Sequence, residues 1–333
     1  MTAPETGGPH VVAFGGGHGL SASLRALAAL QDDVPGLDIT AVVTVGDDGG
    51  SSGRLRAERG TLPPGDLRQA LAALAGRSTD AAGVANLFQH RFPGTGSSDR
   101  ASADPLAGHA VGNLVLCGLF EMYGDPVVAL DHAAAMVSAR GRVLPMSPEP
   151  IGLEADIRDP DGTENTTSSE VRTLIGQHSV AIAEGRVEAV RLSPIDPPAC
   201  AEAVHAVARA DWLIFGPGSW YTSVIPHLLV PDLAKAILAS PAKRLVILNL
   251  AVEKETKGLS LSDHLNALTR YLPGLHADVV LADGKAVGDP EPVSRAAQSL
   301  GARLVLASVA MDDGTPCHDP AALTLALAPL LVG

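Results

Sequence analysis

The first residues that could do chemistry form a glycine-rich segment directly after an apolar stretch. Residues 10–14 predict a buried strand, and Leu20 begins the apolar face of a predicted helix. Glycines between them let the backbone approach a ligand, and free N–H groups at the helix start attract anions such as pyrophosphate. A turn needed only for packing is the alternative interpretation. The candidate ligand-binding residues of this first glycine segment are Gly15, Gly16, Gly17, His18 and Gly19.

The first glycine segment matches neither of two familiar nucleotide motifs. It is not a P-loop, because no Gly-Lys-Ser/Thr follows the glycines. It also departs from the dinucleotide pattern G-x-G-x-x-G, because Leu20 occupies the third glycine position. An NAD(P)-binding oxidoreductase is therefore disfavoured.

An acidic segment, residues 44–54, follows the next predicted strand, residues 38–45, and combines carboxylates, glycines and hydroxyls. Asp47 and Asp48 could ligate a hard cation, bind ribose hydroxyls or orient a phosphate together with Arg54. Arg56 and Arg59 could extend an anion site, although at least one arginine is expected to be an ordinary surface charge. A solvated turn is the alternative. The candidates here are Asp47, Asp48, Gly49, Gly50, Ser51, Ser52 and Arg54.

Two further polar residues stand at predicted helix starts. Asp66 either caps the helix predicted for residues 67–75 or faces Asp47 and Asp48 and shares their ligand or cation; both interpretations remain open. Asn113 offers a donor and an acceptor at the start of an apolar helix. Its neighbour His109 is expected to be a structural hydrogen-bonding residue rather than a catalyst.

A second glycine segment, residues 215–223, follows the predicted strand 211–215 and repeats the same logic. Its candidate ligand-binding residues are Gly216, Gly218, Ser219, Thr222 and Ser223. Glycine-rich strand ends in one parallel sheet indicate one crevice, at the carboxyl ends of the strands. This segment contains no Gly-x-Ser-x-Gly nucleophile elbow, and no set of nucleophile, base and orienting residue can be assembled from the sequence. Binding is therefore favoured over catalysis.

The elements that must position these residues alternate between apolar strands and amphipathic helices, which predicts an α/β fold with a parallel sheet. Residues 10–140 and 199–331 are expected to form the α/β core. Short β-like pieces between turn signals predict a small inserted antiparallel β element over residues 141–192, and residues 76–105 are expected to be less regular. No internal repeat is found, so residues 1–333 are interpreted as one domain.

Composition excludes some partners. The chain of 333 residues carries 24 Lys and Arg against 37 Asp and Glu, a net charge of −13, which opposes binding to nucleic acid and to anionic membranes. Any phosphate must therefore be held locally. The three cysteines form no C-x-x-C pair, which favours a reducing compartment. We expect a cytoplasmic protein, because no secretory signal and no apolar run of about 18 to 20 residues is visible.

Seven motifs of the chain together resemble the YvcK family, the so-called gluconeogenesis factors of the CofD-like superfamily. They are GGGHGLSASLRAL, TAVVTVGDDGGSSGRLR, LPPGDLRQAL, LFQHRF, GHAVGNL, RGRVLP and GPGSWYTSVIPHLLVP. The resemblance implies a Rossmann-like sheet flanked by helices and binding of UDP-N-acetylglucosamine. It also implies a role in cell-wall synthesis and morphogenesis during gluconeogenic growth, with no established catalysis. His18 replaces a threonine that is commoner in the family and could still donate to a phosphate.

The same resemblance implies a site and an alternative activity. Residues 15–19, Asp47, Asp48, Asp66, Asn113 and residues 216–219 would line a nucleotide crevice. The related transferase branch moves a phospholactyl-type group from a guanylylated donor onto a deazaflavin precursor with the help of Mg²⁺. On that alternative, a magnesium-dependent 2-phospholactate transferase-like enzyme, Asp47 and Asp66 would hold the metal. The expected partners are the nucleotide ligand, cell-wall synthesis proteins and further copies of the chain in a homo-oligomer.

Overall fold

A seven-stranded parallel sheet forms the centre of the computed structural model, which describes residues 7–94, 104–158, 171–183, 185–251, 256 and 259–332. Its strand order is β10-β9-β8-β7-β1-β2-β3. The strands are β1 (His10–Gly15), β2 (Asp38–Val43), β3 (Arg142–Pro145), β7 (Trp212–Phe215), β8 (Lys243–Ile247), β9 (Val279–Asp283) and β10 (Arg303–Ala307). The strand order reverses between β1 and β7, which makes their carboxyl ends the topological switch point where open α/β sheets bind ligands.

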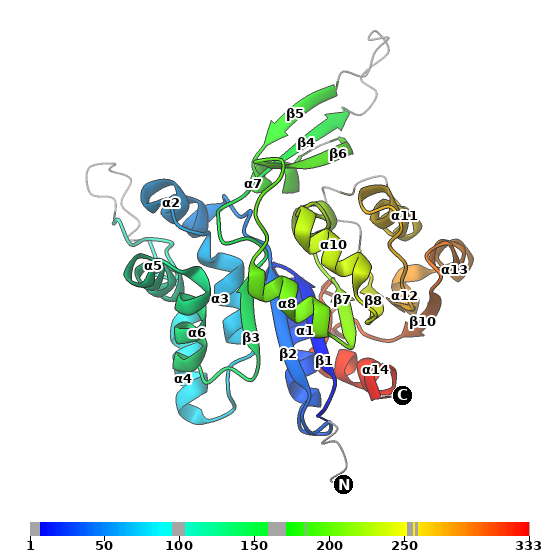
Figure 1. Ribbon diagram of the computed structural model, residues 1–333, viewed down its shortest axis with the longest axis horizontal. Helices are drawn as coiled ribbons and strands as arrows, with labels where there is room; N and C mark the ends of the chain where they lie inside the picture. Colours follow the sequence, from blue (N-terminus) through cyan, green and yellow to red (C-terminus); the bar gives the residue numbers. More distant parts are fainter. Residues whose placement is uncertain are drawn as a thin grey trace.

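Helices cover both faces of this sheet (Figure 1). They are α1 (Gly17–Leu30), α2 (Gly50–Arg59), α3 (Pro64–Ala73), α4 (Thr79–Gln89), α5 (Val111–Tyr123), α6 (Pro126–Met136), α8 (Ala201–Arg209), α10 (Pro231–Ala239), α11 (Leu261–Tyr271), α13 (Pro290–Ser299) and α14 (Pro320–Val332). Shorter helical turns are α7 (Gln177–Ala181), the π-helical η2 (Trp220–Val224), α9 (Ile225–Leu228) and α12 (Gly284–Val287). Helix α1 packs against α3 and α14, and α8 packs against α10.

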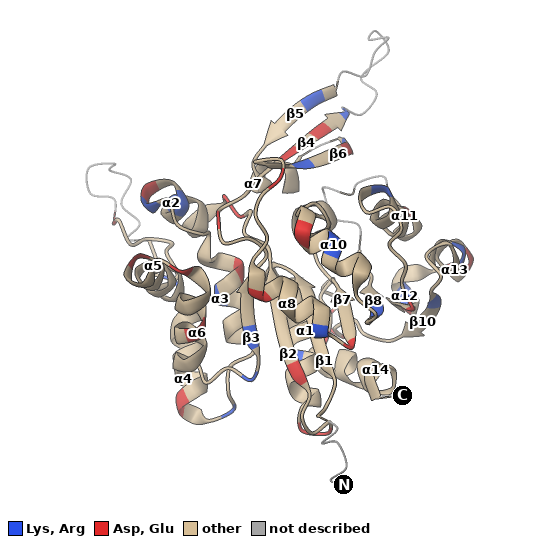
Figure 2. Ribbon diagram, viewed as in Figure 1, with Lys and Arg blue, Asp and Glu red and all other residues tan. Residues whose placement is uncertain are grey.

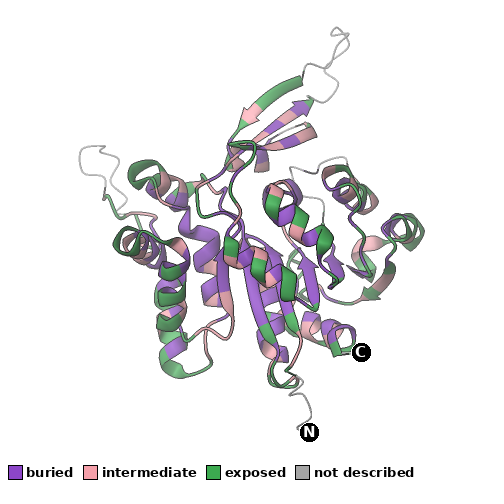
Figure 3. Cartoon of the chain, viewed as in Figure 1, coloured by how far each residue is buried: buried purple, intermediate pink, exposed green. Residues whose placement is uncertain are grey.

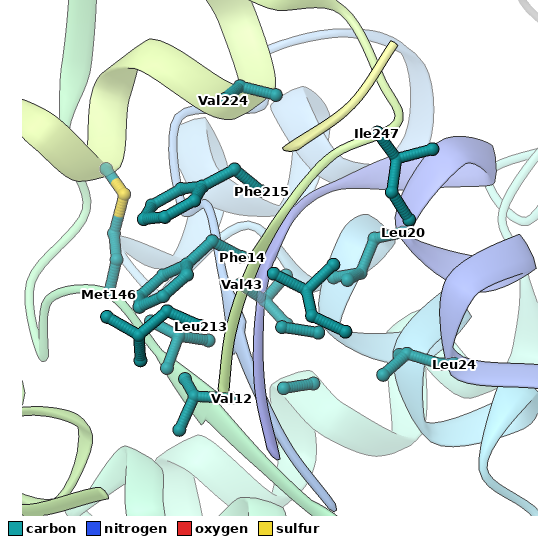
Figure 4. Close-up of a cluster of buried hydrophobic side chains, with 14 of the residues drawn as sticks. Val12, Phe14, Leu20, Leu24, Val43, Met146, Leu213, Phe215, Val224 and Ile247 are labelled. Carbon is teal, nitrogen blue, oxygen red and sulfur yellow. The ribbon is translucent and has the colours of Figure 1, made fainter. Parts of the chain in front are cut away.

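The central strands are apolar on both faces because helices cover both, and Figure 3 shows them as the most continuously buried part of the chain. Phe14 at the end of β1 and Phe215 at the end of β7 stack with ring centroids 4.9 Å apart and planes 9° from parallel. Figure 4 shows this pair among aliphatic side chains of the sheet and of α1, including Leu20 and Leu24. The strand ends that precede both glycine segments are therefore anchored in one core.

A separate antiparallel sheet rises above the carboxyl ends of the main strands (Figure 1). It contains β4 (Gly152–Arg158), β5 (Val171–Ile175) and β6 (Arg186–Ser193) in the order β5-β4-β6. Buried and more exposed residues alternate along β4, as expected for a sheet with one covered face. The chain enters and leaves this element beside the carboxyl ends of the main strands.

The predicted α/β fold, its parallel sheet and the inserted antiparallel element are confirmed, but several boundaries were wrong. Strand β3 lies inside the range 141–192 predicted for the insert, yet it pairs in parallel with β2 in the main sheet. Residues 17–19 form the first turn of α1 and residues 50–53 that of α2, where loops were predicted. Helix α4 occupies a stretch that was expected to be less regular. The first turns of α1 and α2 are rich in glycine and serine, so they lack the apolar periodicity that predicts a helix.

Candidate ligand-binding crevice

The two glycine segments meet backbone to backbone at the switch point. A Cβ on Gly19 would lie 2.3 Å from the carbonyl oxygen of Pro217 and 2.7 Å from Cα of Gly218. A Cβ on Gly16 would lie 2.4 Å from Oδ2 of Asp66. Only glycine fits at these two positions, because any side chain would push the segments apart. The two glycine segments are therefore in direct contact at the carboxyl ends of the neighbouring strands β1 and β7.

Asn249, which follows β8, holds the second glycine segment in place. The backbone N–H of Gly218 donates to Oδ1 of Asn249, and Nδ2 of Asn249 donates back to the carbonyl of Gly218, each at 2.9 Å. The hydroxyl of Ser23 on α1 donates to the carbonyl of Gly216 at 3.1 Å. Sequence reasoning missed Asn249, although its position directly after a strand of the core is the signal that marked the other candidates.

Asp66 lies in the first turn of α3, whose N-cap is Pro63, and its side chain makes no capping hydrogen bond to that helix. Its carboxylate interacts with Asp47 of the acidic segment. The backbone N–H of Gly17 donates to the Asp66 carboxylate. Burial, together with the negative charge of Asp47, raises the pKa of Asp66 to about 7, against the opposing effects of the Gly17 hydrogen bond and of Arg68. Gly65 separates the two acids, since a Cβ there would lie 2.9 Å from Oδ2 of Asp47. Asp47 and Asp66 therefore form a like-charge pair beneath the first glycine segment.

The inserted sheet touches the crevice through α7. The backbone N–H of His178 donates to Oδ1 of Asp48 at 2.8 Å, and Nε2 of Gln177 donates to the carbonyl of Thr222 at 3.0 Å. Gly176, immediately before α7, has φ +101°, and a Cβ there would lie 2.1 Å from Oδ2 of Asp48. The short helix thus bridges the acidic segment and the second glycine segment.

An open cleft of about 710 Å³ lies beside the acidic segment, along α2. Asp48, Ser51, Arg54, Arg91 and Gly108 are among its lining residues. Arg54 donates to the carbonyl of Ala107 at 2.7 Å, and Arg91 donates to the carbonyl of Gly108 at 2.5 Å, so both guanidinium groups are held at the rim. Figure 2 shows acidic residues in the connection from β2 to α2 and residues of both charge signs on α2.

The other two arginines of α2 do not line this cleft. Arg56 donates to the carbonyls of Gly46 and Ile151, and Arg59 lies 3.6 Å from Glu121. They support the local structure, as expected for at least one of them. Arg54 is therefore the α2 arginine that can contact a ligand in the cleft, and Arg91 is a cleft residue that sequence reasoning missed.

A buried chain of hydrogen bonds runs behind the cleft. Nε of Arg68 donates to Oδ1 of Asn113 at 2.8 Å, and Nδ2 of Asn113 donates to Oγ of Ser51 at 2.9 Å. Oγ of Ser51 lies 2.9 Å from Nδ1 of His109. All four side chains are at most 5% exposed. Asn113 thus reaches the acidic segment, as predicted, but through protein contacts.

The remaining candidates occupy different positions. Gly49 donates to Oδ1 of Asp47 in a tight turn before α2, and Gly50 adopts φ +49°. Ser52 is buried against Gly65, where a Cβ would lie 2.4 Å from its Oγ. Thr222 and Ser223 are buried in η2, whereas His18 is exposed on the first turn of α1. The predicted hydroxyl groups of Ser52, Thr222 and Ser223 are therefore buried in the protein.

The described residues can also be examined for metal-binding clusters and for helices that could cross a membrane. Among the residues that the structure describes, no group of three or more His, Cys, Asp or Glu side chains is placed to hold a metal ion. Within the same residues, no single helix is long and apolar enough to cross a membrane. The two helical segments Trp220–Leu228 and Pro231–Ala239 are together long and apolar enough, but they are bent by 75° relative to each other.

Comparison with known proteins assigns this fold to the CofD-like class. The family model "2-phospho-L-lactate transferase CofD" matches residues 11–307. A putative gluconeogenesis factor from Mycobacterium tuberculosis is 46% identical over 321 residues, which cover 95% of this chain and 89% of that protein. The gluconeogenesis factor of Bacillus subtilis is 36% identical over 300 residues, which cover 89% of this chain and 85% of that protein.

A solved structure agrees with these relatives. The crystal structure of a UPF0052 family protein from Bacillus halodurans matches with a TM-score of 0.79 and 33% identity, covering 96% of this chain and 98% of that one. The chain belongs to the YvcK family of gluconeogenesis factors within the CofD-like superfamily. The resemblance seen in the seven sequence motifs is thereby confirmed.

Proposed function

We propose that this protein binds UDP-N-acetylglucosamine at the carboxyl ends of β1 and β7, over the place where the two glycine segments meet, and acts as a regulatory protein in cell-wall synthesis and morphogenesis during gluconeogenic growth. The observation that carries the proposal is the backbone contact of Gly19 with Pro217 and Gly218 at the switch point. Backbone N–H groups in the first turns of α1 and η2 can donate to a diphosphate there, which suits a protein whose net charge of −13 supplies no general attraction for phosphate.

Unsatisfied polar atoms also support a ligand at this place. Within the described part of the chain, Oγ1 of Thr44 and Oε1 of Gln177 are buried without a hydrogen-bond partner. Thr44 directly adjoins Gly16, because a Cβ on Gly16 would lie 2.6 Å from its methyl carbon. Buried polar atoms normally have partners, so hydroxyl or amide groups of a nucleotide sugar would satisfy an otherwise costly arrangement.

Mg²⁺ fits the same crevice as an accompanying ion. The like-charge pair of Asp47 and Asp66 is partly buried, and its mutual repulsion is relieved by a cation between the carboxylates. Mg²⁺ commonly uses one or two carboxylates and completes its coordination with waters and phosphate oxygens. When bound, the ion would neutralise charge on a diphosphate, while the glycine N–H groups orient it.

Regulation would pass from the crevice to a partner through the inserted sheet. Helix α7 touches Asp48 on one side and the carbonyl of Thr222 on the other, so a ligand that moves either segment also moves the insert. We extend the proposal to cell-wall synthesis proteins as the partners that bind this surface, to a cytoplasmic location and to a homo-oligomeric state. Analytical ultracentrifugation with and without ligand tests the oligomeric state.

Calorimetry tests the proposed ligand directly. The protein is titrated with UDP-N-acetylglucosamine in the presence and absence of Mg²⁺. Asp47→Ala and Gly218→Val should abolish binding while the unfolding transition stays cooperative, since the first removes a charge at the crevice and the second strains a backbone held at φ +147°. No detectable heat at millimolar ligand, or unchanged affinity in both variants, would refute the proposal.

The second candidate function is a magnesium-dependent transferase of the 2-phospholactate type. The observation in its favour is the acidic pair beside a phosphate-binding crevice, together with the name of the matching family model. The protein is incubated with Mg²⁺, a deazaflavin precursor and guanylylated phospholactate or phosphoenolpyruvate. Mass spectrometry of the acceptor decides the outcome, because an unchanged acceptor mass excludes this activity.

A further inference from the structure

We propose that Ser51 and His109 form a nucleophile and base pair that takes a phosphoryl group from a phosphoanhydride bound in the arginine-rimmed cleft. Oγ of Ser51 lies 2.9 Å from Nδ1 of His109, although the residues are far apart in the sequence. The pair differs from the proposed nucleotide-sugar site, and its chemistry does not depend on that ligand.

The direction of the buried hydrogen bonds gives Ser51 its role. Arg68 can only donate, so the atom of Asn113 that it contacts must be the acceptor oxygen. The amide nitrogen of Asn113 therefore faces Ser51 and donates to Oγ. With one lone pair of Oγ occupied in this way, the hydroxyl proton points along the short contact to Nδ1 of His109.

His109 is suited to receive that proton. Nδ1 accepts from Ser51 only when the imidazole is neutral and carries its own proton on Nε2. Burial lowers the pKa of His109, and the positive charges of Arg54 and Arg91 lower it further against the opposing effect of Glu58. The imidazole is thus an unprotonated base at neutral pH. Arg68 and Asn113 act as positioning residues, because they hold Oγ in the correct orientation.

The cleft offers a place for a phosphorylated substrate against this pair. Ser51 lines the cleft of about 710 Å³ together with Arg54 and Arg91, whose guanidinium groups can bind phosphate oxygens. Ser51 also lies in the first turn of α2, a helix of ten residues whose first N–H groups have no acceptor within the helix. These donors can stabilise the negative charge that develops on phosphoryl oxygens.

The reaction balances without a further reagent. Oγ of Ser51 attacks the terminal phosphorus of the anhydride and forms a new O–P bond. The P–O bond to the leaving phosphate breaks, and that phosphate keeps the electron pair. The Ser51 proton moves to Nδ1 of His109, which then donates it to the leaving group. The product is a phosphoserine at position 51 and a neutral imidazole.

Labelling with diisopropyl fluorophosphate tests the nucleophile. In this reaction the Ser51 O–P bond forms, the P–F bond breaks and fluoride leaves, while His109 takes the proton. Peptide mass spectrometry should find one adduct, on Ser51, in the full-length protein and none in Ser51→Ala. His109→Gln keeps a hydrogen-bond acceptor but removes the base, so labelling should slow by about 100-fold. His205→Gln, which alters an exposed histidine on α8, should label like the wild type.

A measurement on the wild type keeps the test independent of variant folding. The labelling rate should already be level at neutral pH and stay level above it, because His109 is unprotonated there, whereas an unassisted hydroxyl keeps reacting faster as the pH rises. Incubation with acetyl phosphate should also place a phosphoryl group on Ser51. Absence of any adduct, an adduct on another residue, or an equal rate in His109→Gln would overturn the proposal.

Discussion

The backbone N–H of His178 donates to Oδ1 of Asp48 at 2.8 Å and so ties the inserted sheet to the acidic segment. Asp48→Ala removes this acceptor at a cost of about 1 kcal/mol, which corresponds to roughly fivefold more frequent opening. Hydrogen exchange at residues 177–181 should speed up by that factor. Asp232→Ala breaks an exposed pair with Lys235 on α10 and should leave these amides unchanged. Equal protection in both variants would show that the link carries no energy.

The two hydrogen bonds between Asn249 and Gly218 predict a larger loss of stability. Asn249→Ala leaves the N–H and carbonyl of Gly218 without their partner at a site that is 6% exposed. Unfolding in urea should show a loss of about 2 kcal/mol. Calorimetry should show at least about tenfold weaker binding of UDP-N-acetylglucosamine, since about 1.4 kcal/mol of lost preorganisation is tenfold in affinity. Asn266→Ala on the exposed face of α11 is the control and should change neither value.

The contact between the glycine segments can be tested with a single methyl group. Gly19→Ala places a Cβ 2.3 Å from the carbonyl oxygen of Pro217, so the segments must separate and ligand affinity should be lost. Gly118→Ala on α5 meets nothing within 4 Å and should stabilise the protein by about 0.5 to 1 kcal/mol, because alanine is the better helix former. Differential scanning calorimetry and ligand titration distinguish the two variants. Intact binding in Gly19→Ala would contradict the proposed position of the ligand.

Asp66 predicts a dependence of stability on pH. Its pKa is raised by burial to about 7 from 3.8, so the folded protein holds this proton more tightly than the unfolded chain. The contribution of Asp66 to stability is therefore complete below the unfolded pKa and is lost as the pH rises through about 7. Between pH 5 and pH 8 the loss should be on the order of 3 kcal/mol relative to Asp66→Asn. Parallel pH curves for the two proteins would contradict this assignment.

The same residue links proton release to the proposed cation. Mg²⁺ binds the ionised carboxylate, so it should raise the unfolding temperature more at pH 8 than at pH 6. In Asp66→Asn the difference between the two pH values should disappear. An equal effect of Mg²⁺ on the variant and the wild type would place the ion elsewhere.

Sequence patterns predicted the core of the fold because parallel strands are buried on both faces and therefore apolar throughout. Phe14 and Phe215 illustrate this, since each ends an uninterrupted apolar strand. The helix starts at Gly17 and Gly50 were missed because their stability comes from tertiary contacts with Asp66 and the acidic segment rather than from helix propensity. The strand β3 was assigned to the insert because nothing in its four residues indicates that it pairs with β2.

Candidate residues that directly follow a strand could be predicted from the sequence. Contacts between residues that are far apart in the chain could not. Asp47 and Gly218 follow strands of the sheet and were identified from that position alone. The pairing of Ser51 with His109 spans 58 positions, and no local pattern announces it. No nucleophile and base pair could be assembled from the sequence, because the fold alone brings Ser51 and His109 together.

A crystal structure with UDP-N-acetylglucosamine tests the central claim most directly. The account predicts a diphosphate against the first turns of α1 and η2, beside the contact of the two glycine segments, with its oxygens within hydrogen-bond distance of backbone N–H groups. It also predicts that any Mg²⁺ contacts Asp47 or Asp66. A ligand found away from the carboxyl ends of β1 and β7, making no hydrogen bond to these N–H groups, would contradict the account.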